Sequence, residues 1–137
     1  MKKTFISILI LTTFICCEKK EPGNLKYALT IPGGCFLDKG LSLKNGLIIP
    51  TDTVSYSFTN DSLNIFAGFN AACCGEYSHS SSIKGDSILI KILTTQAGLC
   101  NCLCYYTYNF RFSGNANSYN YRVSIDDHLN FTGKIKP

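Results

Sequence analysis

Cysteine is the residue type whose number and spacing in this 137-residue chain point most directly to chemistry. Two of its eight cysteines lie near the amino terminus, and six follow: Cys35, Cys73, Cys74, Cys100, Cys102 and Cys104. An even set of cysteines outside the cytoplasm favours disulfide bonds, and six cysteines allow fifteen pairings. Residues two apart on a strand have Cα atoms about 6.6–6.8 Å apart and parallel Cβ vectors, which disfavours bridges within segment 100–104. We therefore predict that each cysteine of that segment pairs with Cys35, Cys73 or Cys74, which leaves six pairings open.

Cys73 and Cys74 are adjacent, so on a regular strand their side chains would point to opposite faces. The Gly75 that follows them predicts a turn or bulge that lets both cysteines pair. Each bridge then contributes typically about 2–4 kcal/mol, a large share of the roughly 5–15 kcal/mol by which a small domain is stable.

A thiolate metal site is the alternative use of these cysteines. Three cysteines on one strand face, a nearby cysteine pair and His79 would offer ligands for zinc or cuprous ion. The spacing lacks the paired two-residue gaps of a zinc knuckle, His79 lies among serines, and His128 beside Asp126 and Asp127 is typical of a turn. We therefore expect disulfides and no metal. A redox role is less favoured, because no isolated cysteine pair with a two-residue gap opens a helix and activates a thiolate.

The three cysteines of segment 100–104 open the clearest strand in the sequence, at 100–113. Alternation places these cysteines and four aromatic residues on one face, and mostly polar residues on the other. Other runs with strand character are 25–31, 53–58, 63–69, 78–83, 87–93, 119–125 and 129–135. The fold class that this pattern predicts is all-β: a single immunoglobulin-like antiparallel β-sandwich of about seven or eight strands over residues 25–137.

Turn residues separate the runs. Asn60-Asp61 and Asp126-Asp127 each link two strands, Gly85-Asp86 predicts a tight hairpin, and 114–117 predicts a looser one.

The amino-terminal segment predicts export from the cytoplasm. Lys2 and Lys3 precede an apolar run at 5–15, which suits a signal peptide but is shorter than the roughly 20 residues of a membrane span. We predict that residues 1–16 are removed and that 17–24, a charged stretch with proline and glycine, forms a flexible tether. Removing the two lysines changes the formal charge from +4 to +2, because 13 basic residues become 11 against 9 acidic ones. This charge is too small to indicate a nucleic-acid partner.

The residues at the predicted cut resemble the lipobox of bacterial lipoproteins, with the small residue Cys16 before Cys17 and Phe14-Ile15 before both. The resemblance implies that Cys17 carries three acyl chains, palmitate among them, and that membrane attachment is effectively permanent. The Cys-Cys-Gly segment at 73–75, the run CNCLCYYTYNFRFSG and the Tyr-x-Val strand at 121–123 resemble small, uncharacterised lipoproteins of Bacteroidota. That resemblance implies a lipid-anchored place in the cell envelope, at the outer membrane on its periplasmic or surface face. It brings no activity with it.

Three serine or threonine residues follow aspartates and precede aliphatic residues: Thr53, Ser62 and Ser87. These segments resemble the O-glycosylation motif of the same phylum, but aspartate followed by serine or threonine also commonly opens a strand. Both interpretations stay open.

The sequence predicts no catalytic residue and no cofactor, because it has only two histidines, no phosphate-binding glycine loop and no Gly-x-Ser-x-Gly elbow. We expect a non-enzymatic binding or structural accessory module, held to the membrane by its lipid, whose partner is an envelope protein or a glycan. Tyr105, Tyr119 and the asparagine-rich segment 115–120 are candidates for a binding patch, although such residues are more often an exposed strand edge. The alternative function is a thiolate protein that binds zinc or copper.

Overall fold

A computed structural model describes residues 24–36, 50–59, 61–98, 100–115 and 118–136. Within these residues the chain forms eight strands and no helix: β1 (Lys26–Phe36), β2 (Thr53–Thr59), β3 (Ser62–Ala72), β4 (Glu76–Lys84), β5 (Ser87–Gln96), β6 (Leu103–Ser113), β7 (Asn120–Ile125) and β8 (Leu129–Lys134). A membrane-crossing helix of sufficient length and hydrophobicity is therefore not found in the described part of the chain. The predicted signal peptide, the predicted acylation residue Cys17 and most of the predicted tether lie outside the described residues.

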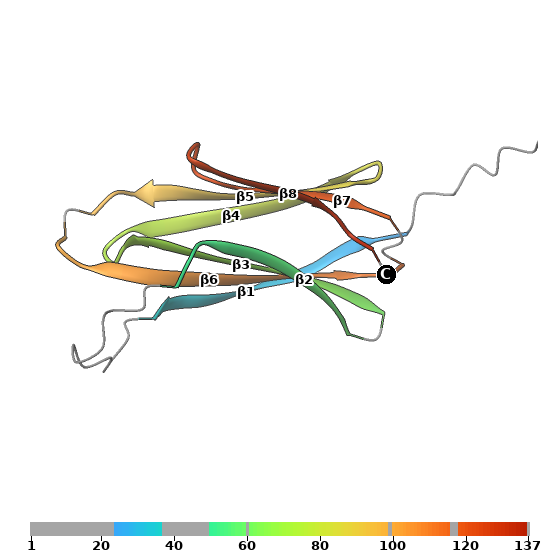
Figure 1. The fold of residues 1–137 in the computed structure, drawn as a ribbon, viewed down its shortest axis with the longest axis horizontal. Coiled ribbons are helices and arrows are strands. Elements are labelled where there is room, and N and C mark those ends of the chain that lie inside the picture. Colours follow the sequence, from blue (N-terminus) through green and yellow to red (C-terminus); the bar gives the residue numbers. More distant parts are fainter. Residues whose placement is uncertain (1–23, 37–49, 60, 99, 116–117, 137) are drawn as a thin grey trace, which may run out of the picture.

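The strands form two four-stranded sheets that pack face to face (Figure 1). One sheet has the order β1-β6-β3-β2 and is antiparallel throughout. The other has the order β4-β5-β7-β8, in which β5 and β7 run parallel and the remaining pairs are antiparallel. The predicted β-sandwich is confirmed, and the predicted antiparallel pairing is found in every described strand pair except β5–β7, which is parallel. The immunoglobulin-like character of the sandwich remains a prediction.

Alternation of apolar and polar residues explains why each strand buries one face. On β6 every second residue from Cys104 to Phe112 is at most 7 % exposed, while the residues between them point away from the core. The core is completed by inward-facing residues of both sheets, chiefly Leu63, Ile65, Phe69, Ile88, Ile90, Ile92, Val123 and Ile125. The alternation over residues 100–113 predicts that the whole cysteine–aromatic face lies in the core. This is confirmed from Cys104 to Phe112 and is wrong for Cys100, which is half-buried, and for Cys102, which is exposed.

All eight predicted runs are strands, with ends that differ by a few residues. The largest differences are at β1, which continues to Phe36, and at β6, which begins at Leu103 rather than at residue 100. Cys100 and Cys102 therefore belong to the connection before β6. This connection turns toward the β3–β4 connection, and the Cys73 amide donates a hydrogen bond to the Cys102 carbonyl there (3.3 Å).

Two kinds of connection join the strands. Gly85-Asp86 makes the predicted tight hairpin, in which Lys84 pairs with Ser87 and Gly85 has a φ of 59° that an L side chain rarely adopts. The predicted hairpin at 114–117 is wrong, since β6 and β7 lie in different sheets and the chain crosses between them here. The reason is that β7 pairs with β5 and so belongs to the second sheet, not to the sheet that contains β6.

The two ends of the sandwich differ in what they carry. At one end the chain enters β1 beside Gly114, whose position leaves no room for a Cβ next to the Asn24 carbonyl. At the other end lie the end of β1 and the crossings from β3 to β4 and from β5 to β6 (Figure 1). We call this second end the cysteine end, because the six described cysteines gather there.

Candidate functional site: the cysteine end of the sandwich

Three disulfides join the six cysteines. Cys35–Cys104 connects the end of β1 to the start of β6, with Cα atoms 5.3 Å apart. Cys73–Cys102 and Cys74–Cys100 connect the β3–β4 crossing to the β5–β6 crossing, with Cα separations of 5.6 and 6.2 Å. Each bridge joins one cysteine of segment 100–104 to one of the earlier three, so the predicted pairing between these two sets is confirmed.

The adjacent cysteines Cys73 and Cys74 form both their bridges because they occupy a turn. The Gly75 amide donates a hydrogen bond to the Ala72 carbonyl (3.0 Å), which closes this turn directly after β3. The predicted turn near Gly75 is therefore confirmed. It directs two consecutive side chains to the same neighbouring connection, which a regular strand would not allow.

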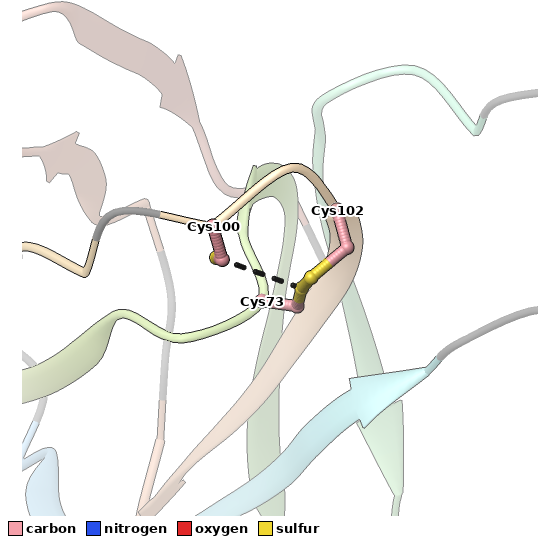
Figure 2. Close-up of side chains that lie close together, drawn as sticks. All are labelled: Cys73, Cys100 and Cys102. Carbon is pink, nitrogen blue, oxygen red and sulfur yellow. Dashed lines mark hydrogen bonds between the residues drawn. A yellow bond between two sulfur atoms is a disulfide. The ribbon is translucent and has the colours of Figure 1, made fainter.

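The sulfur atoms of the two neighbouring bridges lie close together. Cys100 Sγ is 3.7 Å from Cys73 Sγ, across the gap between one bridge and the next (Figure 2). The Cys74 amide donates a hydrogen bond to Cys100 Sγ (3.2 Å). Cys74 and Cys102 are exposed, while Cys73 and Cys100 are half-buried. The sequence predicted the bridges but gave no sign of this contact between them.

Aromatic residues support the turn from the core side. The Tyr106 side chain is only 7 % exposed, and its hydroxyl lies 3.2 Å from the Ala72 carbonyl and 3.3 Å from the Gly75 carbonyl. Its ring packs against that of Tyr77, with centroids 4.7 Å apart. Burial raises the pKa of the Tyr106 hydroxyl above its ordinary value of 10.0, so this hydroxyl remains a hydrogen-bond donor further into alkaline solution than a free phenol would.

Gly98 is a site residue that the sequence analysis missed. A Cβ at this position would overlap Cys74 Sγ and the Cys74 backbone, so the β5–β6 connection approaches the Cys74–Cys100 bridge as closely as it does because residue 98 is glycine. A glycine two residues before a paired cysteine is the signal that was present in the sequence.

His79 does not join the sulfur cluster. Among the described residues, the donor atoms that gather within 4.8 Å of one another are the Sγ atoms of Cys73, Cys100 and Cys102. The His79 ring instead packs against Tyr108 and Phe110, with centroids 5.5 and 5.9 Å apart. The proposed role of His79 as an additional metal ligand is therefore not supported by its position.

The candidate glycosylation residues each begin a strand. Thr53, Ser62 and Ser87 are the first residues of β2, β3 and β5, and all three are half-buried. The Thr53 hydroxyl donates to the Thr51 carbonyl (2.9 Å), and the Ser87 hydroxyl donates to an Asp86 carboxylate oxygen (3.0 Å). These are the local hydrogen bonds of turn residues, and glycosylation at these positions stays a prediction.

Tyr105 and Tyr119 do not form a common patch. Tyr119 is 2 % exposed and belongs to the core, whereas Tyr105 lies on the outer face of β6, across Gly68. Part of the asparagine-rich segment, residues 116–117, lies outside the described residues.

A second surface feature is an open depression of about 430 Å³ at the end of the sandwich away from the cysteines. It is lined by Ser87, Leu89, Asn120, Tyr121, Arg122 and Thr132, with Gly133 beside them. It holds one cationic side chain and no second charged group, so it offers little chemistry beyond hydrogen bonding.

No family description, curated protein or solved structure matches this chain.

Proposed function

We propose that this protein is a lipid-anchored module of the cell envelope that binds another envelope protein or a glycan, or serves as an accessory structural part. The observation that carries the proposal is that the amino-terminal entry to the sandwich and the disulfides lie at opposite ends. The described chain begins at Asn24, beside Gly114, while the three disulfides lie at the opposite end. A lipid on Cys17, seven residues before Asn24, would hold the first end near the membrane and direct the cysteine end away from it.

The disulfides support an oxidising location, since such bridges persist outside the cytoplasm. An immunoglobulin-like sandwich at the outer membrane, attached as in lipoproteins of Bacteroidota, agrees with this arrangement. A small all-β domain whose crossings are linked by disulfides is suited to presenting a fixed surface to a partner.

The anchor is tested by feeding cells an alkyne analogue of palmitate and following the protein through membrane fractionation. The full-length protein is expected to carry the label and to sediment with membranes, and the Cys17→Ser variant is expected to lose both properties. Cys16→Ala is the matched control, because it keeps a small residue before the acylated cysteine. Label and membrane association that persist in Cys17→Ser would contradict the anchor.

The binding role is tested with photo-crosslinking residues at two exposed positions. Asn101 lies at the cysteine end, and Lys84 lies at the hairpin of the opposite end. We expect a defined envelope partner to be crosslinked from position 101 in intact cells and not from position 84. Equal capture from both positions, or from neither, would contradict a binding surface at the cysteine end.

A thiolate metal site is the second candidate function, and one observation favours it. The Sγ atoms of Cys73, Cys100 and Cys102 lie within 4.8 Å of one another, close enough for small side-chain shifts to bring all three onto one cuprous or zinc ion. Two of these sulfurs share a disulfide and the third belongs to another, so binding would need both bridges reduced. Anaerobically reduced protein would then bind one metal ion per chain, and Cys100→Ser would bind much less than Cys35→Ser.

A further inference from the structure

The two neighbouring disulfides at the cysteine end place a third sulfur against a formed bridge. Cys100 Sγ lies 3.7 Å from Cys73 Sγ, although Cys100 is bonded to Cys74 and Cys73 is bonded to Cys102. Disulfide exchange requires a thiolate that can reach a disulfide sulfur. A Cys100 thiolate released in this position would already be in contact with its target (Figure 2).

We propose that Cys73, Cys74, Cys100 and Cys102 form a thiol–disulfide exchange site. A small thiol opens the Cys74–Cys100 bridge, and the released Cys100 then displaces Cys102 from its bridge with Cys73. This inference does not depend on the lipid anchor or on the binding role. It rests on the four sulfur positions and on their surroundings.

The first step is attack by the incoming thiolate on the exposed Cys74 Sγ. A mixed disulfide forms between the small thiol and Cys74, and Cys100 leaves as a thiolate. The Cys74 amide, whose N–H points at Cys100 Sγ from 3.2 Å, stabilises the negative charge on that sulfur. A better stabilised leaving thiolate makes this exchange faster.

The second step is attack by the Cys100 thiolate on Cys73 Sγ. A Cys73–Cys100 bond forms, the Cys73–Cys102 bond breaks, and Cys102 leaves as a thiolate. One thiolate has entered and one has been released, and the number of disulfide bonds is unchanged. No external oxidant or reductant is needed. Because Cys102 is exposed, the result is a reactive thiol at the surface.

The backbone around the sulfurs is held in place while the bonds change. Ala72 pairs with Leu103 at the end of the β3–β6 ladder, and the Cys73 amide bonds to the Cys102 carbonyl directly beyond that pair. The Tyr106 hydroxyl fixes the turn from the core side by hydrogen bonds to the carbonyls of Ala72 and Gly75. In the third bridge Cys35 is exposed and Cys104 is buried (1 % exposed), so attack at Cys35 would release Cys104 as a buried thiolate, which desolvation disfavours.

The experiment uses the purified oxidised protein and glutathione as the small thiol. After brief exposure the reaction is stopped with acid, free thiols are alkylated, and the linkages are mapped by mass spectrometry without reduction. We expect glutathione on Cys74, a new Cys73–Cys100 linkage and an alkylated Cys102, with Cys35–Cys104 intact. Alkylation of Cys100 with the Cys73–Cys102 bridge intact would overturn the proposal. So would exchange that spreads to Cys35 and Cys104, since it would indicate unfolding.

Two variants that remove the same bridge separate exchange from simple loss of a disulfide. Cys74→Ser leaves Cys100 unpaired, and we expect its alkylation to be divided between Cys100 and Cys102. Cys100→Ser leaves Cys74 unpaired, and we expect alkylation at Cys74 with Cys73–Cys102 intact. If Cys74→Ser is alkylated at Cys100 alone, the contact between the two bridges does not support transfer and the proposal fails.

Discussion

At the scale of single residues, burial changes the acid–base behaviour of three tyrosines near the cysteine end. Burial raises the pKa of Tyr77, Tyr106 and Tyr108 above the ordinary value of 10.0, and the nearby Tyr106 hydroxyl raises the pKa of Tyr77 and Tyr108 further. Phe69 stacks on Tyr106 and Tyr108, which keeps these rings in the apolar core. The folded protein therefore favours the neutral phenols more strongly than the unfolded chain does.

The first prediction concerns alkaline pH. Because the folded pKa values are raised, this stabilisation is complete below pH 10 and is lost as the pH rises from about 10 through the folded values. We expect the midpoint of urea unfolding to fall over that range. In an absorbance titration of tyrosinate formation, part of the absorbance rise should occur at higher pH in the folded protein than in the urea-unfolded protein. Tyr106→Phe and Tyr108→Phe should each reduce the absorbance rise at higher pH. A single titration step at the ordinary pH in the folded protein would contradict the prediction.

The residues of the candidate site were predictable to different degrees. Strand geometry predicted that the bridges join the two sets of cysteines but left six pairings open. The prediction of the sets is confirmed although Cys100 and Cys102 lie in the connection before β6 and not on the strand. The contact between Cys73 Sγ and Cys100 Sγ was not predictable, because it depends on how two crossings distant in sequence meet. The same is true of Gly98, whose role is to leave space for Cys74. Tyr119 was misjudged because a tyrosine beside asparagines and serines looks exposed, whereas the crossing carries its ring into the core.

At the scale of elements, the sequence predicted the strands better than their arrangement. Period-two alternation is a local property, so all eight runs were recognisable. Sheet membership depends on pairs far apart in sequence, such as β1 with β6, and local patterns do not specify these pairs. For this reason Gly114 suggested a hairpin, while the structure uses it where β6 ends and the chain crosses to the other sheet.

The second prediction concerns β6, the strand that lies between β1 and β3 and carries the central aromatic row. Phe110 is fully buried at its middle, so Phe110→Ala is expected to lower the free energy of unfolding by about 3–5 kcal/mol. Phe58→Ala is the matched control, because Phe58 on the edge strand β2 is 42 % exposed and should lose much less. Urea unfolding with all disulfides intact measures both losses. Similar losses for the two variants would contradict the burial of the β6 row.

At the scale of the whole molecule, the disulfides divide into two kinds of constraint. Cys35–Cys104 has a sequence separation of 69 and joins two strands that are already neighbours in one sheet. Cys73–Cys102 and Cys74–Cys100 have separations of 29 and 26, and the second bridge is nested inside the first. The nested pair ties together the two crossings between the sheets at this end, so both bridges restrict the same part of the unfolded chain.

The third prediction follows from this nesting. With Cys73–Cys102 intact, Cys74–Cys100 closes a ring of only about five residues, and loop-closure entropy gives it roughly 2 kcal/mol, whereas the 69-residue separation gives Cys35–Cys104 about 4 kcal/mol. Replacing both cysteines of a bridge by alanine should therefore destabilise the protein most for Cys35 and Cys104, and the cavity left by the buried Cys104 adds to that loss.

Removing both nested bridges together should cost more than the sum of the two single removals, because the bridge that remains after one removal still restrains the two crossings. Urea unfolding of the three bridge variants and of the double-bridge variant measures these differences. Equal losses for every bridge, or strict additivity for the nested pair, would mean that the bridges act through strain or packing in the folded state. The result would then contradict a role for the cysteine end in restricting the unfolded chain.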